Sequence, residues 1–289
     1  RSTLFPYTTL FRSLADVIVL NWNGKEELLR CLRSLVPALS EGVGVLVVDN
    51  GSVDDSVEAV NKEFPGVALL RLRRNVGYAA GNNTGFVRAM KERPDYVVFL
   101  NNDTEVGPEV FSRLTDVLAT DSSAGIAVPK ILYMASPDRI WYAGGVVRLE
   151  LGMVRHEGIR CIDRGQFDRR RTTGYATGCC FAMRSADFRR LGGFDERFGI
   201  YAEDVDLSLR VRDLGLRVVY EPGAVVWHRV SVSSGGPFSV RRMLRRNRAM
   251  LRLLRKHRAW SGFVCYPFVL FGQAVSMLFS LLKKTDRHA

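Results

Sequence analysis

The sequence lacks the cysteine patterns of disulfide-rich and zinc-binding proteins. Its five cysteines are Cys31, Cys161, Cys179, Cys180 and Cys265. No pair of them has the spacing of a zinc knuckle or a redox motif. The adjacent Cys179 and Cys180 would strain a disulfide. We therefore expect reduced thiols in a cytosolic protein and no metal site made of cysteine.

Acidic residues are absent from residues 222–285, a stretch that holds twelve Lys and Arg. The whole chain has 42 Lys and Arg against 30 Asp and Glu. Removing the twelve leaves 30 basic residues, which balance the 30 acidic ones. The net charge of +12 therefore belongs to a C-terminal element, and the rest of the chain is neutral.

The first residues lack the continuous apolar core of a signal peptide. The run Thr3–Ser13 instead resembles the translation of a sequencing-library adapter. We expect residues 1–13 to be a non-native segment and begin the fold argument at residue 14.

Apolar runs alternate with helix-like patterns from residue 17 onward. The runs are Val17–Leu20, Val43–Val48, Val67–Leu72 and Tyr96–Leu100. Apolar residues recur at helical spacing after the first two, at Leu28, Cys31, Leu32 and Leu35 and at Val57, Val60 and Phe64. Ser52 suits a helix start, because Asp54 and Asp55 would then lie in the first turn. This alternation predicts an α/β fold with a parallel, doubly wound sheet.

Polar residues follow three of these runs directly. Asn21–Gly24 follows the first, Asp49 ends the second, and Asn101–Asp103 follows the fourth. Ligands of open α/β sheets bind beyond the carboxyl ends of the strands, so these side chains predict a ligand site. Polar strand-to-helix loops are the alternative, and turn formation accounts for Gly51 and Ser52.

Three glycines, Gly77, Gly81 and Gly85, recur every four residues after the third run. On a helix they would share one face and let the backbone approach a neighbour closely. Their spacing differs from the dinucleotide-binding fingerprint. Close packing of helix on sheet is one interpretation. The other is a ligand at the helix start, helped by Asn75 and exposed amides.

Six short motifs together resemble family 2 glycosyltransferases, especially the rhamnosyltransferase-like branch. The resemblance covers roughly Val17 to Arg258, and each motif alone is modest. The motifs are Asn21–Gly24, Val47–Ser52, Asn75–Asn83, Leu100–Asp103, Gly192–Glu196 and Glu203–Asp206.

The resemblance implies a Rossmann-like glycosyltransferase-A fold with a mostly parallel central sheet. Asp49 matches the residue that contacts the base or ribose of the donor. Asp103 matches the last carboxylate of a D-x-D motif that holds Mg²⁺ or Mn²⁺ on the diphosphate. Asn101 replaces the first Asp, which implies weak metal binding without the nucleotide. The residues expected to bind the nucleotide sugar are Asn21, Asn23, Asp49, Asn75, Gly77, Asn82 and Asn102.

The Glu-Asp motif implies the catalytic base. Asp204 matches that base, Glu203 is expected to help orient the acceptor, and Asp206 is expected to be structural. Acids in a first helical turn are favourable without catalysis, which is the alternative explanation. His228 follows the apolar run Val225–Trp227, and the resemblance implies that it reaches the cation or the diphosphate, although a lone histidine is more often simply hydrogen-bonded.

The C-terminal region predicts membrane association. Residues 241–258 form a basic amphipathic helix pattern, which suggests an anionic membrane surface. An ordinary solvated helix face is the alternative, and no recognition motif for nucleic acid accompanies it. Residues 259–282 carry no charge and are long enough to span a bilayer or lie in its interface. We expect a catalytic domain at 14–236 and a membrane-associating helical tail at 237–289, on the cytoplasmic face of the cell membrane.

These features together predict an inverting, metal-dependent glycosyltransferase. It would move a sugar, with rhamnose suggested by the branch, from a nucleotide-diphosphate donor to a glycan or lipid-linked glycan during cell-envelope polysaccharide assembly. The alternatives are a sugar-phosphate nucleotidyltransferase and a membrane scaffold that binds a nucleotide sugar without turnover. The first usually carries a Gly-rich, Lys-containing loop where this chain has Asn21–Lys25.

Overall fold

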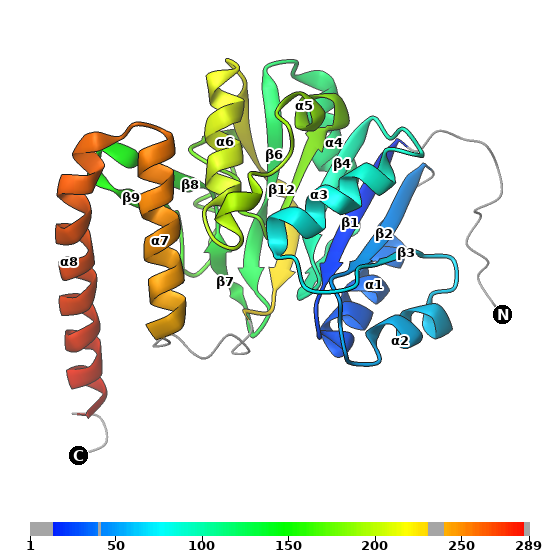
Figure 1. Cartoon of the computed structure of the whole chain (residues 1–289), viewed down its shortest axis with the longest axis horizontal. Coiled ribbons are helices and arrows are strands. Elements are labelled where there is room, and N and C mark those ends of the chain that lie inside the picture. Colours follow the sequence, from blue (N-terminus) through cyan, green and yellow to red (C-terminus); the bar gives the residue numbers. More distant parts are fainter. Residues whose placement is uncertain (1–13, 40–41, 231–239, 286–289) are drawn as a thin grey trace.

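The computed structural model describes residues 14–39, 42–230 and 240–285, and Figure 1 shows a central sheet with helices packed around it. The expected non-native segment 1–13 lies outside these residues. The strands are β1 (Ala15–Asn21), β2 (Val43–Asp49), β3 (Ala68–Arg71), β4 (Tyr96–Asn101), β5 (Thr104–Val106), β6 (Ala124–Tyr133), β7 (Ser136–Tyr142), β8 (Gly145–Arg148), β9 (Met153–His156), β10 (Arg171–Thr173), β11 (Cys180–Arg184) and β12 (Arg217–His228). The α-helices are α1 (Lys25–Ala38), α2 (Ser56–Glu63), α3 (Tyr78–Ala89), α4 (Val110–Thr120), α5 (Ser185–Arg190), α6 (Glu203–Asp213), α7 (Val240–Lys256) and α8 (Trp260–Thr285).

The main sheet has the strand order β10-β12-β6-β11-β4-β1-β2-β3, with β5 beside β12 and β7 beside β6. Strands β3, β2, β1 and β4 are parallel to one another, as are β6 and β12. The predicted α/β fold with a mostly parallel central sheet is therefore confirmed. The sequence does not predict β11, which runs antiparallel between β4 and β6.

The carboxyl ends of β1, β2 and β4 meet at one edge of the sheet. Asn21 pairs with Asp49 across β1 and β2, and Leu20 pairs with Asn101 across β1 and β4. Because β11 is antiparallel, it begins at this same edge, where Cys180 pairs with Leu100. The loop before β11 therefore lies beside the polar strand ends.

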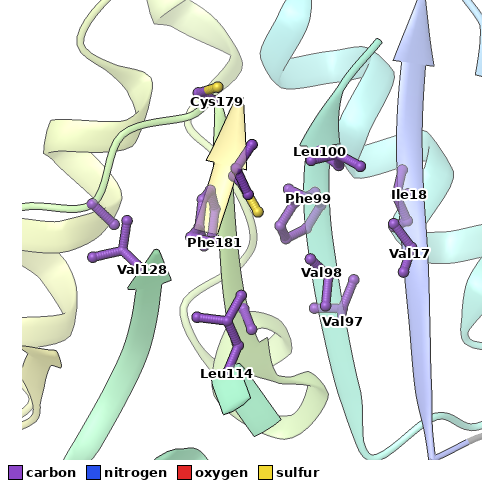
Figure 2. Close-up of a cluster of buried hydrophobic side chains, with 14 of the residues drawn as sticks. Val17, Ile18, Val97, Val98, Phe99, Leu100, Leu114, Val128, Cys179 and Phe181 are labelled. Carbon is purple, nitrogen blue, oxygen red and sulfur yellow. The ribbon is translucent and has the colours of Figure 1, made fainter. Parts of the chain in front are cut away.

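Apolar packing holds these strands in place. Figure 2 shows buried side chains of β1, β4 and β11 in one cluster, including Val17, Val98 and Phe181. The rings of Phe99 and Phe181 are 5.2 Å apart between centroids. Burial of each such side chain stabilises the fold by roughly 1.5–3 kcal/mol, so the strand ends project from a rigid base.

The glycines of α3 let this helix approach the sheet. A Cβ at Gly81 would lie 2.6 Å from Leu20, and one at Gly85 would lie 2.8 Å from both Ile18 and Val48. These separations are too short for a larger residue without movement of the neighbours. The interpretation of this glycine face as close helix-to-sheet packing is therefore confirmed for Gly81 and Gly85.

Helix α2 begins later than predicted. The sequence places its start at Ser52, but α2 starts at Ser56 after Asp55. Ser52 stays in the preceding loop because its hydroxyl group accepts a hydrogen bond from the backbone N–H of Asn23. Asp54 accepts from the backbone N–H of Ser56 instead.

The two C-terminal helices lie side by side at one end of the molecule (Figure 1). Helix α7 confirms the predicted basic helix within two residues at each end. The hydroxyl group of Tyr266 in α8 donates to Asn247 in α7 over 2.9 Å. Gly262 packs against the backbone of Leu149, before β9. Within the described residues, no helix has both the length and the apolar content needed to cross a membrane.

Candidate functional site

A hydrogen-bonded network joins the polar ends of β1, β2 and β4. The Asn102 side chain donates to Asn21 over 2.7 Å, and Asn21 donates to the Ser52 hydroxyl over 3.3 Å. The backbone N–H of Ser52 donates to Asp49 over 3.1 Å. The three strand ends that the sequence singles out therefore share one site.

Asn23 shapes the first loop of this network. Its backbone adopts a left-handed conformation with φ of 49°, which Asn tolerates better than most residues. Its side-chain oxygen accepts a bond from the backbone N–H of Val53 over 2.8 Å. A side chain at the next residue, Gly24, would collide with Asn102. Asn23 thus holds the β1 loop against the β2 loop.

Asp49 offers an unused hydrogen-bond acceptor. Its side chain is almost fully buried, and Oδ1 has no hydrogen-bond partner in the described structure. Arg71 lies 3.9 Å from Oδ2. A buried carboxylate oxygen without a partner is costly unless a ligand satisfies it. This geometry suits a donor group such as a base N–H or a ribose hydroxyl.

Asn50 organises the loop that carries Asn75 and Gly77. Its side-chain amide donates to Asn75 and to the Gly77 carbonyl, each over 3.2 Å, and it accepts from the Val76 backbone N–H. Gly77 has φ of 90° immediately before α3. The network thereby reaches the start of α3, where the sequence predicts that Asn75 and Gly77 contact the nucleotide sugar.

Asn82 makes its side-chain hydrogen bond within its own helix. It is buried within α3, where its side-chain amide donates to the Tyr78 carbonyl over 3.1 Å. In the part of the chain described, no hydrogen bond joins it to the other residues predicted to bind the nucleotide sugar. A buried asparagine inside a helix can donate its side-chain amide to a backbone carbonyl of the preceding turn. The contact with a donor therefore stays a prediction for Asn82.

Asp103 and His228 lie together at the end of β12. His228 Nε2 is 3.2 Å from Asp103 Oδ1 without forming a hydrogen bond, and the Arg229 backbone N–H donates to the Asp103 carbonyl. Asp103 Oδ1 and His228 Nδ1 are both buried without a hydrogen-bond partner. Antiparallel pairing of β5 with β12 brings them together, since Thr104 pairs with His228.

This pair fits a divalent cation that is shared with a ligand. Among the described residues, no three His, Cys, Asp or Glu side chains cluster closely enough to hold a metal ion by themselves. Mg²⁺ usually binds through one or two carboxylates plus phosphates and waters. Asp103 supplies one carboxylate, and His228 adds a ring nitrogen 3.2 Å from its Oδ1.

Glu203 and Asp204 open α6, as predicted. Both Asp204 oxygens accept backbone bonds, from Gly178 N–H and Val205 N–H, each over 2.8 Å. The Asp204 side chain is partly exposed. Glu203 is buried, and its Oε2 has no partner. The two carboxylates therefore have different surroundings.

These surroundings separate the proton affinities of the pair. Burial raises the pKa of Glu203 well above its ordinary value, and the charge of Asp204 raises it further. Burial also raises the pKa of Asp204, but the N–H groups of Gly178 and Val205 oppose that rise. The Asp204 carboxylate is therefore more readily ionised than that of Glu203.

The backbone before this pair adopts an unusual conformation. Tyr201 and Ala202 have φ values of 76° and 68°, in the left-handed region that non-glycine residues rarely adopt. The Gly199 carbonyl accepts a bond from the Tyr78 backbone N–H. Backbone of this kind persists where its surroundings hold it and is frequent at functional sites.

The loop before β11 connects Asp204 with Asp103. Gly178 donates to Asp204, and the next carbonyl, that of Cys179, accepts from the backbone N–H of Asn101. Asn101 lies two residues before Asp103. Through the Asn102–Asn21 bond, the same path continues toward Asp49. Asp49, Asp103 and Asp204 thus belong to one connected set of contacts.

Tyr78 is a residue of this site that the sequence reasoning missed. Its hydroxyl group donates to the Gly178 carbonyl over 2.6 Å, and its ring packs edge-on against Phe194. Burial raises its pKa well above the ordinary value. Its place directly after Gly77, in a motif of the resemblance, is the signal that could have identified it.

Comparison with known proteins identifies relatives of this chain. A family model described as glycosyl transferase family 2 matches residues 16–192. An N-acetylglucosaminyl-diphospho-decaprenol L-rhamnosyltransferase of Mycobacterium tuberculosis is 30% identical over 236 residues, which cover 76% of this chain and 77% of that protein.

Solved structures share the fold. A crystal structure of GalNAc-T7 with UDP, GalNAc and Mn²⁺ has a TM-score of 0.67 at 16% identity, covering 84% of this chain and 48% of that one. A mannosyltransferase of Pyrobaculum calidifontis in complex with GDP-Man and Mn²⁺ has a TM-score of 0.55 at 20% identity, covering 76% and 58%. The chain spans about half the length of each. The likeness confirms the predicted glycosyltransferase fold.

Proposed function

Since the chain belongs to glycosyl transferase family 2, we propose that it is an inverting transferase of cell-envelope polysaccharide assembly. It moves a sugar from a nucleotide-diphosphate donor to a glycan or lipid-linked glycan. Rhamnose is the sugar suggested by the mycobacterial relative, whose name also specifies a lipid diphosphate acceptor. The observation that carries this proposal is the position of Asp204, which accepts a hydrogen bond from Gly178 in the loop whose next residue, Cys179, accepts one from Asn101 at the end of β4.

The donor occupies the edge formed by β1, β2 and β4. Asp49 accepts a hydrogen bond from the base or ribose through its free Oδ1. Asn21, Asn23 and Asn102 hold the surrounding loops in place. Asn75 and Gly77 lie at the start of α3, where the Asn50 side chain ties their loop to the end of β2 beside the same donor.

Asp103 and His228 would hold Mg²⁺ or Mn²⁺ on the donor diphosphate, where the ion would neutralise charge on the leaving group. The buried Asp103 Oδ1 without a hydrogen-bond partner, 3.2 Å from His228 Nε2, supports this assignment. Asn101 supplies no charge, so we expect the ion to bind well only together with the diphosphate.

Asp204 acts as the general base. As the acceptor oxygen bonds to the anomeric carbon, the carbon–oxygen bond to the diphosphate breaks and its electron pair leaves with the diphosphate. The Asp204 carboxylate takes the hydroxyl proton in the same step. Protonated Glu203 can donate a hydrogen bond that orients the acceptor. Its raised pKa suits this role.

A screen of nucleotide sugars tests the proposed function. The full chain is heated with UDP-, GDP- and thymidine-diphosphate sugars in the presence of Mn²⁺, and one donor is expected to raise Tm by roughly 5–10 °C near saturation. That donor should then release nucleoside diphosphate when acceptor is added. Release of pyrophosphate from a nucleoside triphosphate and a sugar phosphate would instead identify a nucleotidyltransferase. Binding without any turnover would identify a scaffold.

We propose that the C-terminal helices hold the enzyme against an anionic membrane surface, on the cytoplasmic side. Four arginines of α7 are exposed at helical spacing, namely Arg245, Arg248, Arg252 and Arg255. Helix α8 exposes an apolar ridge of Trp260, Val264, Phe268 and Phe271, three of them more than two-thirds exposed. Basic and aromatic side chains of this kind suit the headgroup region, where a lipid-linked acceptor would be presented.

Substitution of Arg245, Arg248 and Arg252 by Gln is expected to weaken binding to anionic vesicles by roughly 10²-fold, because each basic residue contributes about 1 kcal/mol there. Sedimentation with phosphatidylglycerol vesicles measures the change. The control removes the exposed Arg189, Arg190 and Arg212 of the catalytic body and should bind normally. Equal binding by both triple variants would contradict the membrane surface.

A further inference from the structure

Asp206 is a fully buried carboxylate in the first turn of α6, two residues after Asp204. Three basic side chains surround it. Arg210 lies 2.8 Å from Oδ2, while Lys256 and His257 lie 2.7 and 3.0 Å from Oδ1. Arg210 belongs to α6 itself, but Lys256 ends α7 and His257 follows it directly.

Lys256 also holds the loop that precedes α6. Its Nζ lies 2.7 Å from Asp195 as well as from Asp206, and it lies over the ring of Phe198. Asp195 belongs to the Gly192–Glu196 motif. The Lys256 side chain of α7 therefore binds both ends of the segment 195–206. This segment contains Tyr201 and Ala202, whose backbones are left-handed.

The basic side chains of this cluster lower the pKa values of its two carboxylates, Asp206 and Asp195. Burial alone would raise the pKa of Asp206, but His257, Lys256 and Arg210 together hold it below its ordinary value. The pKa of Asp195 is lowered far more, chiefly by Arg197 and then by Lys256. Both carboxylates are therefore ionised, and the contacts to Lys256 are charge-assisted bonds, which are stronger and more directional than neutral ones.

We propose that Lys256 and His257 are positioning residues for the catalytic base, acting through Asp206. This inference rests on the proposed role of Asp204. The backbone N–H of Asp206 donates to the Ala202 carbonyl, so the anchored Asp206 closes the turn that presents Glu203 and Asp204. Residues in strained conformations need such support. Helix α7, whose exposed arginines are proposed to face the membrane, thus also supports the catalytic base.

The test compares kcat, donor KM and Tm in four variants of the full chain. Lys256→Met is expected to lower kcat roughly 10- to 100-fold with donor KM nearly unchanged, because a small displacement of a reacting group costs rate rather than binding. Its Tm should fall by roughly 5 °C or more, since Asp206 loses a partner. Lys256→Arg should restore both. Arg212→Met removes the same charge from an exposed position of α6 and should change neither.

The double variant Asp206→Asn with Lys256→Met separates positioning from stability. It removes the buried charge together with one of its three basic partners, and the amide oxygen at position 206 can still accept from Arg210, so Tm should return most of the way toward that of the unchanged protein. If the cluster positions Asp204, kcat stays low despite the recovered Tm. Recovery of kcat in step with Tm would overturn the inference. Full activity of Lys256→Met beside an inactive Asp204→Asn would also overturn it and leave the proposed function intact. Equal activity of Asp204→Asn and the unchanged protein would instead refute the base itself.

Discussion

Asp204→Asn is expected to lower kcat by roughly 10²–10⁴-fold, the usual contribution of a positioned general base. The amide has nearly the same shape, and one Asn oxygen can still accept from the Gly178 backbone N–H. The Asn side chain cannot take the proton of the acceptor hydroxyl, however. Nucleoside diphosphate affinity should be unchanged, because the predicted donor contacts lie at the strand ends. Initial rates and isothermal titration with nucleoside diphosphate measure the two quantities.

Two companion variants sharpen this result. Glu203→Gln keeps a hydrogen-bond donor at a position where the raised pKa already favours the protonated acid, so it should retain far more activity than Asp204→Asn. Asp213→Asn, at the exposed end of the same helix, should behave like the unchanged protein. A rate for Asp204→Asn equal to that of Asp213→Asn would remove Asp204 as the base.

The pH dependence follows from the same carboxylate. Because burial raises the pKa of Asp204, its ionised form is lost at a higher pH than for an ordinary aspartate. The rate should therefore fall on the acid side with a midpoint above the ordinary value near 3.9. The variant Asp204→Asn should lack this acid limb.

Much of the site could be predicted because strand ends are local signals. An apolar run followed by Asp49, or by Asn101–Asp103, places polar atoms at the carboxyl edge of a parallel sheet whatever the rest of the chain does. The Glu203–Asp204 pair is equally local, since it lies within one helical turn. The gathering of Asp49 and Asn101–Asp103 at one edge follows from the parallel alternation of strands and helices, whereas Asp204 joins them through the loop before the antiparallel β11.

The remaining contacts join residues far apart in the sequence, and no local sequence pattern identifies the residues that make them. Lys256 is one of twelve basic residues in an acid-free stretch, and nothing in its neighbourhood distinguishes it from the exposed Arg255. Its contact with Asp206 spans 50 positions. The antiparallel β11 is similar, because strand direction depends on where the preceding chain enters the sheet. Ser52 looked like a helix cap because its hydroxyl group could serve a helix N-terminus as readily as a neighbouring loop.

Removal of divalent metal is expected to weaken donor binding by roughly 10²-fold or more. Asp103 and His228 offer only one formal negative charge between them, and the described residues provide no third acidic, cysteine or histidine ligand beside them. The diphosphate would then meet Asp103 as a like charge without an ion between them. Titration of UDP, GDP and thymidine diphosphate into the full chain, with Mn²⁺ or with excess chelator, measures the loss.

The nucleoside itself is the internal control for this experiment. Because Asp49 is expected to bind the base or ribose, the affinity of a nucleoside without phosphates should be the same with Mn²⁺ and with chelator. Asp103→Ala should reproduce the chelator effect on the diphosphate, whereas Asp116→Asn, an exposed aspartate of α4, should not. A diphosphate complex that keeps its full affinity in excess chelator would refute the metal role of Asp103 and His228. The strand-end cluster would then have to bind the diphosphate without an ion.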